Sequence, residues 1–273
     1  MSTNGAASAS AHFLVPLLTD YSPMRILAAL PLLFFPLLAS PLLASANCTD
    51  KIQGWAKALR PDLKLDSEHA VCKINPGDSS QVLAALPFAE NVTEDGQGDY
   101  GLGVIVVNAS NGKIISQHYQ AAAISSDAIY FSRLELDTAR YQLAPKLRAF
   151  GVRVTYGGSS RPNPFESEVL TLYAALPGSQ LHPVVSGLEV SRSNGEWDTR
   201  CAGEFTETQR TISISDKGNK GLAALKVEQK VIDTQNRPKG EECERISAEP
   251  VITHFTLNYD GSQYPVPKEL SSL

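Results

Sequence analysis

The segment 102–119, LGVIVVNASNGKIISQHY, decides the fold class. An apolar, β-branched run extends from Leu102 to Asn108, and a second run, from Lys113 to Tyr119, follows the dipeptide Asn111-Gly112. Asn-Gly favours a two-residue hairpin turn, because both central residues of that turn take positive φ. The segment therefore predicts two antiparallel strands joined by a tight turn.

Further strand patterns follow this hairpin along the chain. Residues 150–156 alternate between apolar and polar positions, and Glu168–Ala174 is expected to pair with Leu181–Val190 around Pro177-Gly178. Additional strands are expected over 128–136, 204–215, 222–232 and 251–259. About nine or ten strands with few helices between them predict an antiparallel all-β fold, because parallel strands need crossover helices.

A short helical segment is expected on the N-terminal side of these strands. Pro61 ends an apolar pattern with helical spacing, which consists of Ile52, Trp55, Ala56 and Leu59. Residues 81–86 are interpreted as a single helical turn or a short strand, and 87–99 as a polar loop. The strand–turn–strand units have no fixed period, which favours a mainly antiparallel sandwich or a curled meander over a solenoid or propeller.

Residues 1–46 are expected to form a leader. Met24-Arg25 precedes an apolar run from Ile26 to Leu43, and Ala44-Ser45-Ala46 has the small-x-small pattern that signal peptidase requires. We expect cleavage after Ala46 rather than an uncleaved membrane anchor, because prolines interrupt the run. Residues 1–23 lack a basic region, so we hypothesise that translation starts at Met24 and that 24–46 is the signal peptide. Residues 47–273 are then a single domain with no membrane span.

All four cysteines lie after the expected cleavage site. An even number of cysteines in an exported chain predicts disulfides, which persist in oxidising compartments. Three pairings exist, and proximity in sequence favours Cys48–Cys72 and Cys201–Cys243. The spacing excludes a zinc or C-x-x-C redox site. Lipidation of Cys48 is disfavoured because Asn47 precedes it. Leader and cysteines together predict a periplasmic or secreted protein.

The composition and motifs restrict the function classes. Charged residues make up 19% of the chain and the net charge is −5, so no nucleic-acid footprint exists. Neither a G-x-S-x-G elbow, an H-E-x-x-H motif nor a phosphate loop occurs. We therefore expect a non-catalytic binding or structural role in the bacterial periplasm, with another envelope protein or a glycan as partner. The alternative is a periplasmic hydrolase whose site is assembled from loops such as 157–165 and 194–201.

Three stretches carry a resemblance to other proteins. Asp99-Tyr100-Gly101-Leu102 leads into VIVVN, residues 136–164 read LDTARYQLAPKLRAFGVRVTYGGSSRPNP, and residues 195–205 read GEWDTRCAGEF. They are similar to a group of uncharacterised secreted proteins of Gram-negative bacteria. The resemblance covers most of the mature chain and implies a periplasmic setting and a β fold. It implies no activity and no catalytic residue.

Two loops contain candidate contact residues. Trp197 and Arg200 lie beside Cys201, and Arg161 and Phe165 follow a predicted strand. Tryptophan and arginine are prominent in binding hot spots, so these four residues are candidate binding residues. The alternative for Trp197 is packing on the disulfide in the core.

One segment has the spacing of a calcium loop. The pattern N-x-T-x-D-G-x-x-D places oxygen side chains at Asn91, Thr93, Asp95 and Asp99, with Gly96 available for the turn. Leu102 stands where an EF-hand has its bidentate glutamate, and no helices flank the segment. A plain solvent loop is therefore the favoured interpretation, with weak calcium binding as the alternative. No other cofactor is expected.

Overall fold

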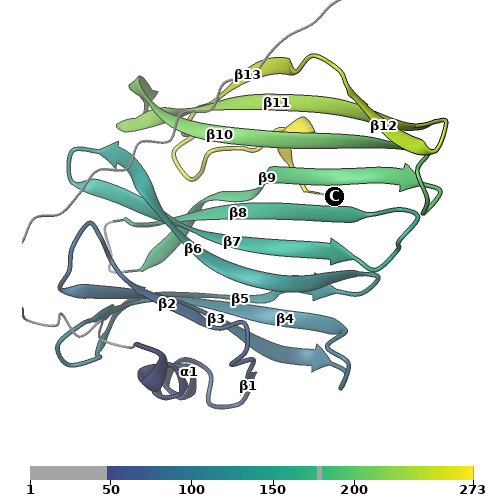
Figure 1. Ribbon diagram of the computed structural model, residues 1–273. Coiled ribbons are helices and arrows are strands. Elements are labelled where there is room, and N and C mark those ends of the chain that lie inside the picture. The colour runs from purple at the N-terminus through teal and green to yellow at the C-terminus, as the bar shows by residue number, and fades with distance from the viewer. Residues whose placement is uncertain (1–47, 177–179, 273) are drawn as a thin grey trace, which may run out of the picture. The chain divides into compact units, whose positions relative to one another are not determined.

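The computed structural model describes residues 48–176 and 180–272, and within them it contains thirteen strands, one α-helix and two 3-10 helices (Figure 1). The helical segments are Cys48–Lys51 (η1), Ile52–Leu59 (α1) and Lys268–Leu270 (η2). The strands are Lys64–Leu65 (β1), Val71–Ile74 (β2), Gln81–Val92 (β3), Gly98–Asn108 (β4), Ile114–Ser126 (β5), Ile129–Ala144 (β6), Leu147–Gly158 (β7), Phe165–Ala175 (β8), Leu181–Trp197 (β9), Gly203–Asn219 (β10), Leu222–Lys239 (β11), Glu242–Ser247 (β12) and Val251–Leu257 (β13).

The strands form two sheets in which every pair is antiparallel. Sheet A has five strands in the order β1-β3-β4-β5, with β2 also paired to β3. Sheet B has eight strands in the order β12-β11-β10-β9-β8-β7-β6, with β13 also paired to β11. Most neighbours are consecutive in sequence, so hairpins suffice to connect them. The predicted all-β fold with a short N-terminal helix is confirmed.

The two central strands of sheet A are buried on both faces. On one face Ala84 and Leu86 of β3 belong to a cluster with Trp55 of α1. On the other face Leu83 and Ala85 belong to a cluster with residues of β6 and β7. Helix α1, sheet A and the β6–β7 part of sheet B are therefore three successive layers, as Figure 1 shows at the lower end of the molecule.

Two long-range bonds hold α1 in place. The Trp55 Nε1–H donates to the Gly112 carbonyl oxygen over 3.0 Å, which joins the helix to the β4–β5 loop. The Cys48–Cys72 disulfide joins η1 to β2. None of the helices within 48–176 and 180–272 is long and apolar enough to cross a membrane.

The C-terminal segment after β13 completes the core of sheet B. Tyr264 is almost fully buried, and its hydroxyl donates to the Ala223 carbonyl while its backbone N–H donates to the Val184 carbonyl. Leu188 bridges to Ser271. The segment, yellow in Figure 1, thus connects β9 with β11 where β10 no longer pairs with β9. Burial raises the pKa of Tyr264 to about 12, so its hydroxyl stays a donor at neutral pH.

The structure decides between the two interpretations of residues 81–86 and corrects that of 87–99. The short-strand alternative is confirmed for 81–86, but β3 continues to Val92 and pairs with β4, so only residues 93–97 form a loop. Seven consecutive residues of β3, Val82–Phe88, are buried. A strand buried on both faces has a continuous apolar run instead of alternation, which removes the period-two signal.

The turn after β4 also differs from the prediction. Of its two expected positive-φ residues, only Gly112 takes positive φ, at 71°. The Asn108 side-chain oxygen accepts hydrogen bonds from the backbone N–H groups of Ser110 and Asn111. This side chain stabilises a longer loop, so a two-residue turn is not needed. The predicted leader, residues 1–46, and the Pro177-Gly178 turn lie outside the described residues.

Candidate functional site

A groove with a volume of about 1010 Å³ crosses one end of sheet B. Its floor follows the strand register, in which Phe165 pairs with Asn194, Asn194 with Thr206, and Thr206 with Asp233. A second row, two residues further along the strands, consists of Glu196, Glu204, Gln235 and Ile246. Since side chains two residues apart point to the same face, both rows project into one groove. We call it the acidic groove.

Three exposed carboxylates make the lining of this groove negatively charged: Glu196, Glu204 and Asp233. Glu196 and Glu204 are direct cross-strand partners, an arrangement of like charges that destabilises a sheet. Asp233 accepts a hydrogen bond from the Thr206 hydroxyl over 2.7 Å. Along the described chain, no arginine, lysine or histidine lines the groove. Glu204 accepts a hydrogen bond from the Gln235 side-chain amide over 3.3 Å. Glu204 and Asp233 thus have neutral donors, and among the described residues none of the three carboxylates has a cation in the groove.

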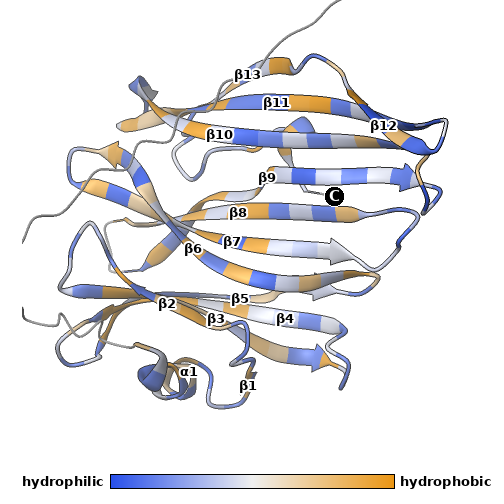
Figure 2. Cartoon of the chain, in the orientation of Figure 1, coloured by the Kyte–Doolittle hydropathy of each residue, from blue (hydrophilic) through white to orange (hydrophobic). Residues whose placement is uncertain are grey.

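Apolar side chains stand at both ends of the groove. Ile129 of β6 and Phe165 of β8 lie on one side, and Ile246 of β12 on the other. Ile129 and Ile246 are each 38% exposed, which is high for isoleucine. Figure 2 shows β9 and β10 as mostly hydrophilic near the hairpin that joins them.

Three of the four candidate contact residues meet at the disulfide. Arg161, Trp197 and Arg200 line a separate hollow of about 490 Å³ beside Cys201–Cys243. Trp197 is half-buried, and its backbone N–H donates to the Pro162 carbonyl oxygen over 2.7 Å. The fourth, Phe165, lies apart from them in the acidic groove. Trp197 alternates with Glu196 along β9, so the two side chains point to opposite faces of the sheet, and the hollow adjoins the groove at Pro164 and Phe205.

The hairpin that carries Trp197 and Arg200 is ordered by Asp198. Its Oδ1 accepts hydrogen bonds from the backbone N–H groups of Arg200 and Cys201, over 2.8 and 2.7 Å. These donors hold the pKa of the Asp198 carboxyl below its usual value. Cys201, at the end of this hairpin, is joined to Cys243, and Cys48 is joined to Cys72. This is the disulfide pairing that the sequence favours.

The four candidate calcium ligands lie in the β3–β4 hairpin. Asn91 and Asp99 pair across the two strands, and Asp99 accepts a hydrogen bond from the Ser125 hydroxyl over 2.6 Å. The Thr93 hydroxyl donates to Asp95 and to the Gln97 carbonyl within the turn. Among the described residues no three histidine, cysteine, aspartate or glutamate side chains form a group that could hold a metal. Calcium binding stays a prediction for this hairpin.

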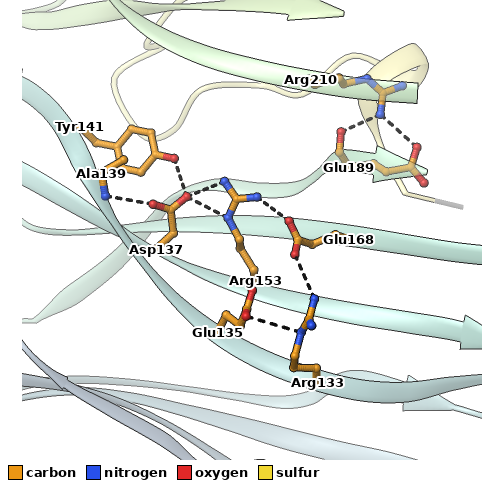
Figure 3. Close-up of polar contacts among 9 residues, drawn as sticks. All are labelled: Arg133, Glu135, Asp137, Ala139, Tyr141, Arg153, Glu168, Glu189 and Arg210. Carbon is orange, nitrogen blue, oxygen red and sulfur yellow. Dashed lines mark hydrogen bonds and ion pairs between the residues drawn. The ribbon is translucent and has the colours of Figure 1, made fainter. Parts of the chain in front are cut away.

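A second set of charges in sheet B is fully paired, as Figure 3 shows. Arg153 of β7 forms ion pairs with Asp137 of β6 and Glu168 of β8. Burial disfavours the ionised form of Asp137, but donation from the Ala139 amide, Tyr141 and Arg153 outweighs it and holds the Asp137 pKa below its usual value. We call this set the β6–β8 ion network.

A more deeply buried ion cluster lies further along the sheet. The Glu189 side chain is 3% exposed and the Arg210 side chain 6%, and their charged atoms lie 3.0 Å apart. Glu189 also accepts from Arg192 over 2.7 Å and from the Ser167 hydroxyl over 2.8 Å. Each oxygen of this carboxylate has a donor, which indicates a structural role.

The four histidines among the described residues do not line the acidic groove. His69 bonds to Asp66 over 2.6 Å and contacts the Phe131 ring. Burial and the neighbouring His182 lower the pKa of His118, so His118 is neutral at pH 7. Ser159 and Ser160 line the groove, but in the part of the chain that the structure describes no histidine joins them there.

Sequence reasoning missed most residues of the groove. Glu204, Asp233 and Ile246 carry no motif, and they come together only because three hairpins place them in register. Glu196 lies next to Trp197, but it points to the other face of the sheet. No protein-family model, curated protein or solved structure matches this chain.

Proposed function

We propose that the chain is an exported, non-catalytic binding protein whose ligand occupies the acidic groove. The observation that carries the proposal is the contrast between the charges of sheet B. The buried carboxylates Glu189 and Asp137 have arginine partners, whereas Glu196 and Glu204 face each other with no cation lining the groove. Like charges left in contact cost stability, and a site that keeps them is expected to gain from a ligand.

Export is part of the proposal. The signal-peptide pattern before Asn47 and the two disulfides support a periplasmic or secreted location, because disulfides persist in oxidising compartments. N-terminal sequencing of the protein purified from cells tests it. Asn47 is the expected first residue, and retention of residues 26–43 would contradict the cleaved leader.

The binding role is tested by mapping ligand contacts in solution. Backbone amide resonances of the ¹⁵N-labelled protein are recorded with short basic peptides and with N-acetylglucosamine oligosaccharides as probes. At least one probe is expected to shift residues 194–196, 204–206 and 233–235. Thr206→Trp fills the groove and should abolish the shifts, whereas Thr211→Trp, on the opposite face of β10, should not. Shifts that survive Thr206→Trp, or no shifts with any probe, would refute the groove as a site.

The alternative hydrolase has a distinct signature. Ser159 and Ser160 in the 157–165 loop are the available hydroxyls of the groove, and the Ser160 oxygen accepts from the Asn163 N–H over 3.2 Å. Turnover of ester or glycoside probes that is lost in Ser159→Ala or Ser160→Ala would favour this alternative over the binding protein.

A further inference from the structure

We infer that the occupant of the acidic groove is an extended basic peptide segment with apolar residues on both sides of its positive charges. This inference rests on the proposed function and names its ligand. Peptide-binding grooves combine pockets for side chains with polar groups for the peptide backbone. Three properties of the groove support such a ligand: its length, its central charge and its apolar ends.

The length fits a short extended peptide. The groove crosses the sheet from Ile129 of β6 to Ile246 of β12, and Phe165 of β8 lies between them. With strands about 4.8 Å apart, the path from β8 to β12 measures about 19 Å and that from β6 about 29 Å. An extended chain advances about 3.3 Å per residue, so this path corresponds to about six to nine residues.

The charge sits in the middle of that path. Glu196, Glu204 and Asp233 come from the successive strands β9, β10 and β11. Arg237 lines an adjoining hollow together with Glu196 and Glu204, but its Nε lies 3.2 Å from a Glu244 oxygen, so it is paired there. The Arg192 guanidinium lies 6.0 Å from the centroid of the Phe165 ring. Its Nε donates to Glu189, so Arg192 is already paired outside the groove. A lysine or arginine of the ligand would relieve the repulsion between Glu196 and Glu204, which a neutral ligand cannot do.

The ends and the floor supply the remaining contacts. Ile129 and Phe165 on one side and Ile246 on the other offer apolar surface to flanking side chains. The side-chain amide of Asn194 offers a donor and an acceptor that suit a peptide backbone; the Gln235 amide donates to Glu204 and keeps a second N–H and its oxygen for such contacts. An oligosaccharide would use the amides but would leave three carboxylates without a counter-charge.

The test uses a defined peptide and the mature protein. Calorimetry measures binding of acetyl-VTKRTV-amide and of acetyl-VTEETV-amide at 50 and 300 mM salt. The basic peptide is expected to bind, to weaken at least threefold at the higher salt because the contact is ionic, and to bind at least tenfold more tightly than the acidic one. Equal affinity of the two peptides, or no binding of the basic peptide at 1 mM, would overturn the inference.

Matched variants locate the contact. Glu196→Gln with Glu204→Gln and Asp233→Asn removes the groove charges, and affinity should fall at least tenfold. The control is a second triple variant, Glu94→Gln with Glu207→Gln and Glu228→Gln. It changes the net charge by the same amount at exposed positions outside the groove, and its affinity for the basic peptide should stay within twofold of the wild-type value. Equal losses in both triple variants would show a general charge effect and overturn the assignment. If an oligosaccharide shifts the groove amides and the basic peptide does not, the peptide inference fails while the binding function stands; if neither shifts them, both fail.

Discussion

Two sets of carboxylates in the same sheet differ in whether their charges have partners. In the buried ion cluster, Glu189 is held by Arg210, Arg192 and Ser167 and is almost inaccessible to water. In the acidic groove, Glu196 and Glu204 face each other in solvent. The first arrangement gives every buried charge a partner, so the loss of one partner is expected to be costly. The second leaves its charges without an ionic partner, and the ligand proposed above would supply one.

The largest expected effect is at the buried ion cluster. Glu189→Ala leaves the nearly buried Arg210 guanidinium without its carboxylate, and the free energy of unfolding should fall by about 3–5 kcal/mol. Urea denaturation measures it. The matched change Glu196→Ala in the groove should alter stability by less than about 0.5 kcal/mol. A loss below about 1 kcal/mol in Glu189→Ala would contradict the distinction between the two sets.

The β6–β8 ion network should give a smaller effect that depends on pH. Asp137→Asn removes a charged acceptor of Arg153 and Tyr141 and should cost about 1–3 kcal/mol at pH 7. Because the Asp137 pKa is lowered in the folded state, its contribution is complete above the unfolded pKa of about 3.9 and is lost as the pH falls through the lower folded value.

Denaturation at pH 7 and at pH 2.5 measures this dependence. The stability difference between wild type and Asp137→Asn should shrink at the lower pH. A difference that is unchanged between the two pH values would show that Asp137 acts through packing rather than through its charge.

Neutralising the acidic groove should have a small effect of the opposite sign. Glu196→Gln with Glu204→Gln and Asp233→Asn removes the like-charge contact, so the free energy of unfolding should rise by about 0.2–1 kcal/mol. The gain should shrink at high salt, since salt screens exposed charges. A destabilised triple variant would mean that these carboxylates support the fold after all.

The smallest expected effect concerns calcium. In the β3–β4 hairpin Thr93 and Asp95 bond to each other and Asp99 bonds to Ser125, so the hairpin is closed without an ion. We expect the melting temperature to stay within about 1 °C in millimolar calcium, as in magnesium. A rise with calcium alone that Asp95→Ala removes would instead establish the calcium loop, because binding to the folded state adds stability.

Local patterns predicted much of the fold. The alternating residues 150–156 lie in β7, and Ile52 and Trp55, with their helical spacing, lie in α1. The Asn111-Gly112 dipeptide lies in the β4–β5 loop. Proximity of the cysteines predicted both disulfides. The same signals left 81–86 as either a helical turn or a short strand and missed the rest of β3, whose burial on two faces hides its period. They also missed β12, which is short and charged.

The sequence by itself determined the all-β class and the antiparallel hairpins, because both depend on residues close together in the chain. It also favoured the observed disulfide pairing, since each of the two bridges joins cysteines that are neighbours in the order of the four. Only the tertiary structure decided which charges meet. Glu189 and Arg210 are about twenty residues apart in sequence, and Glu204 and Asp233 are nearly thirty apart. No local pattern relates the members of either pair. Strand register, which long-range pairing sets, makes one carboxylate a buried ion-pair partner and leaves the other in an open groove.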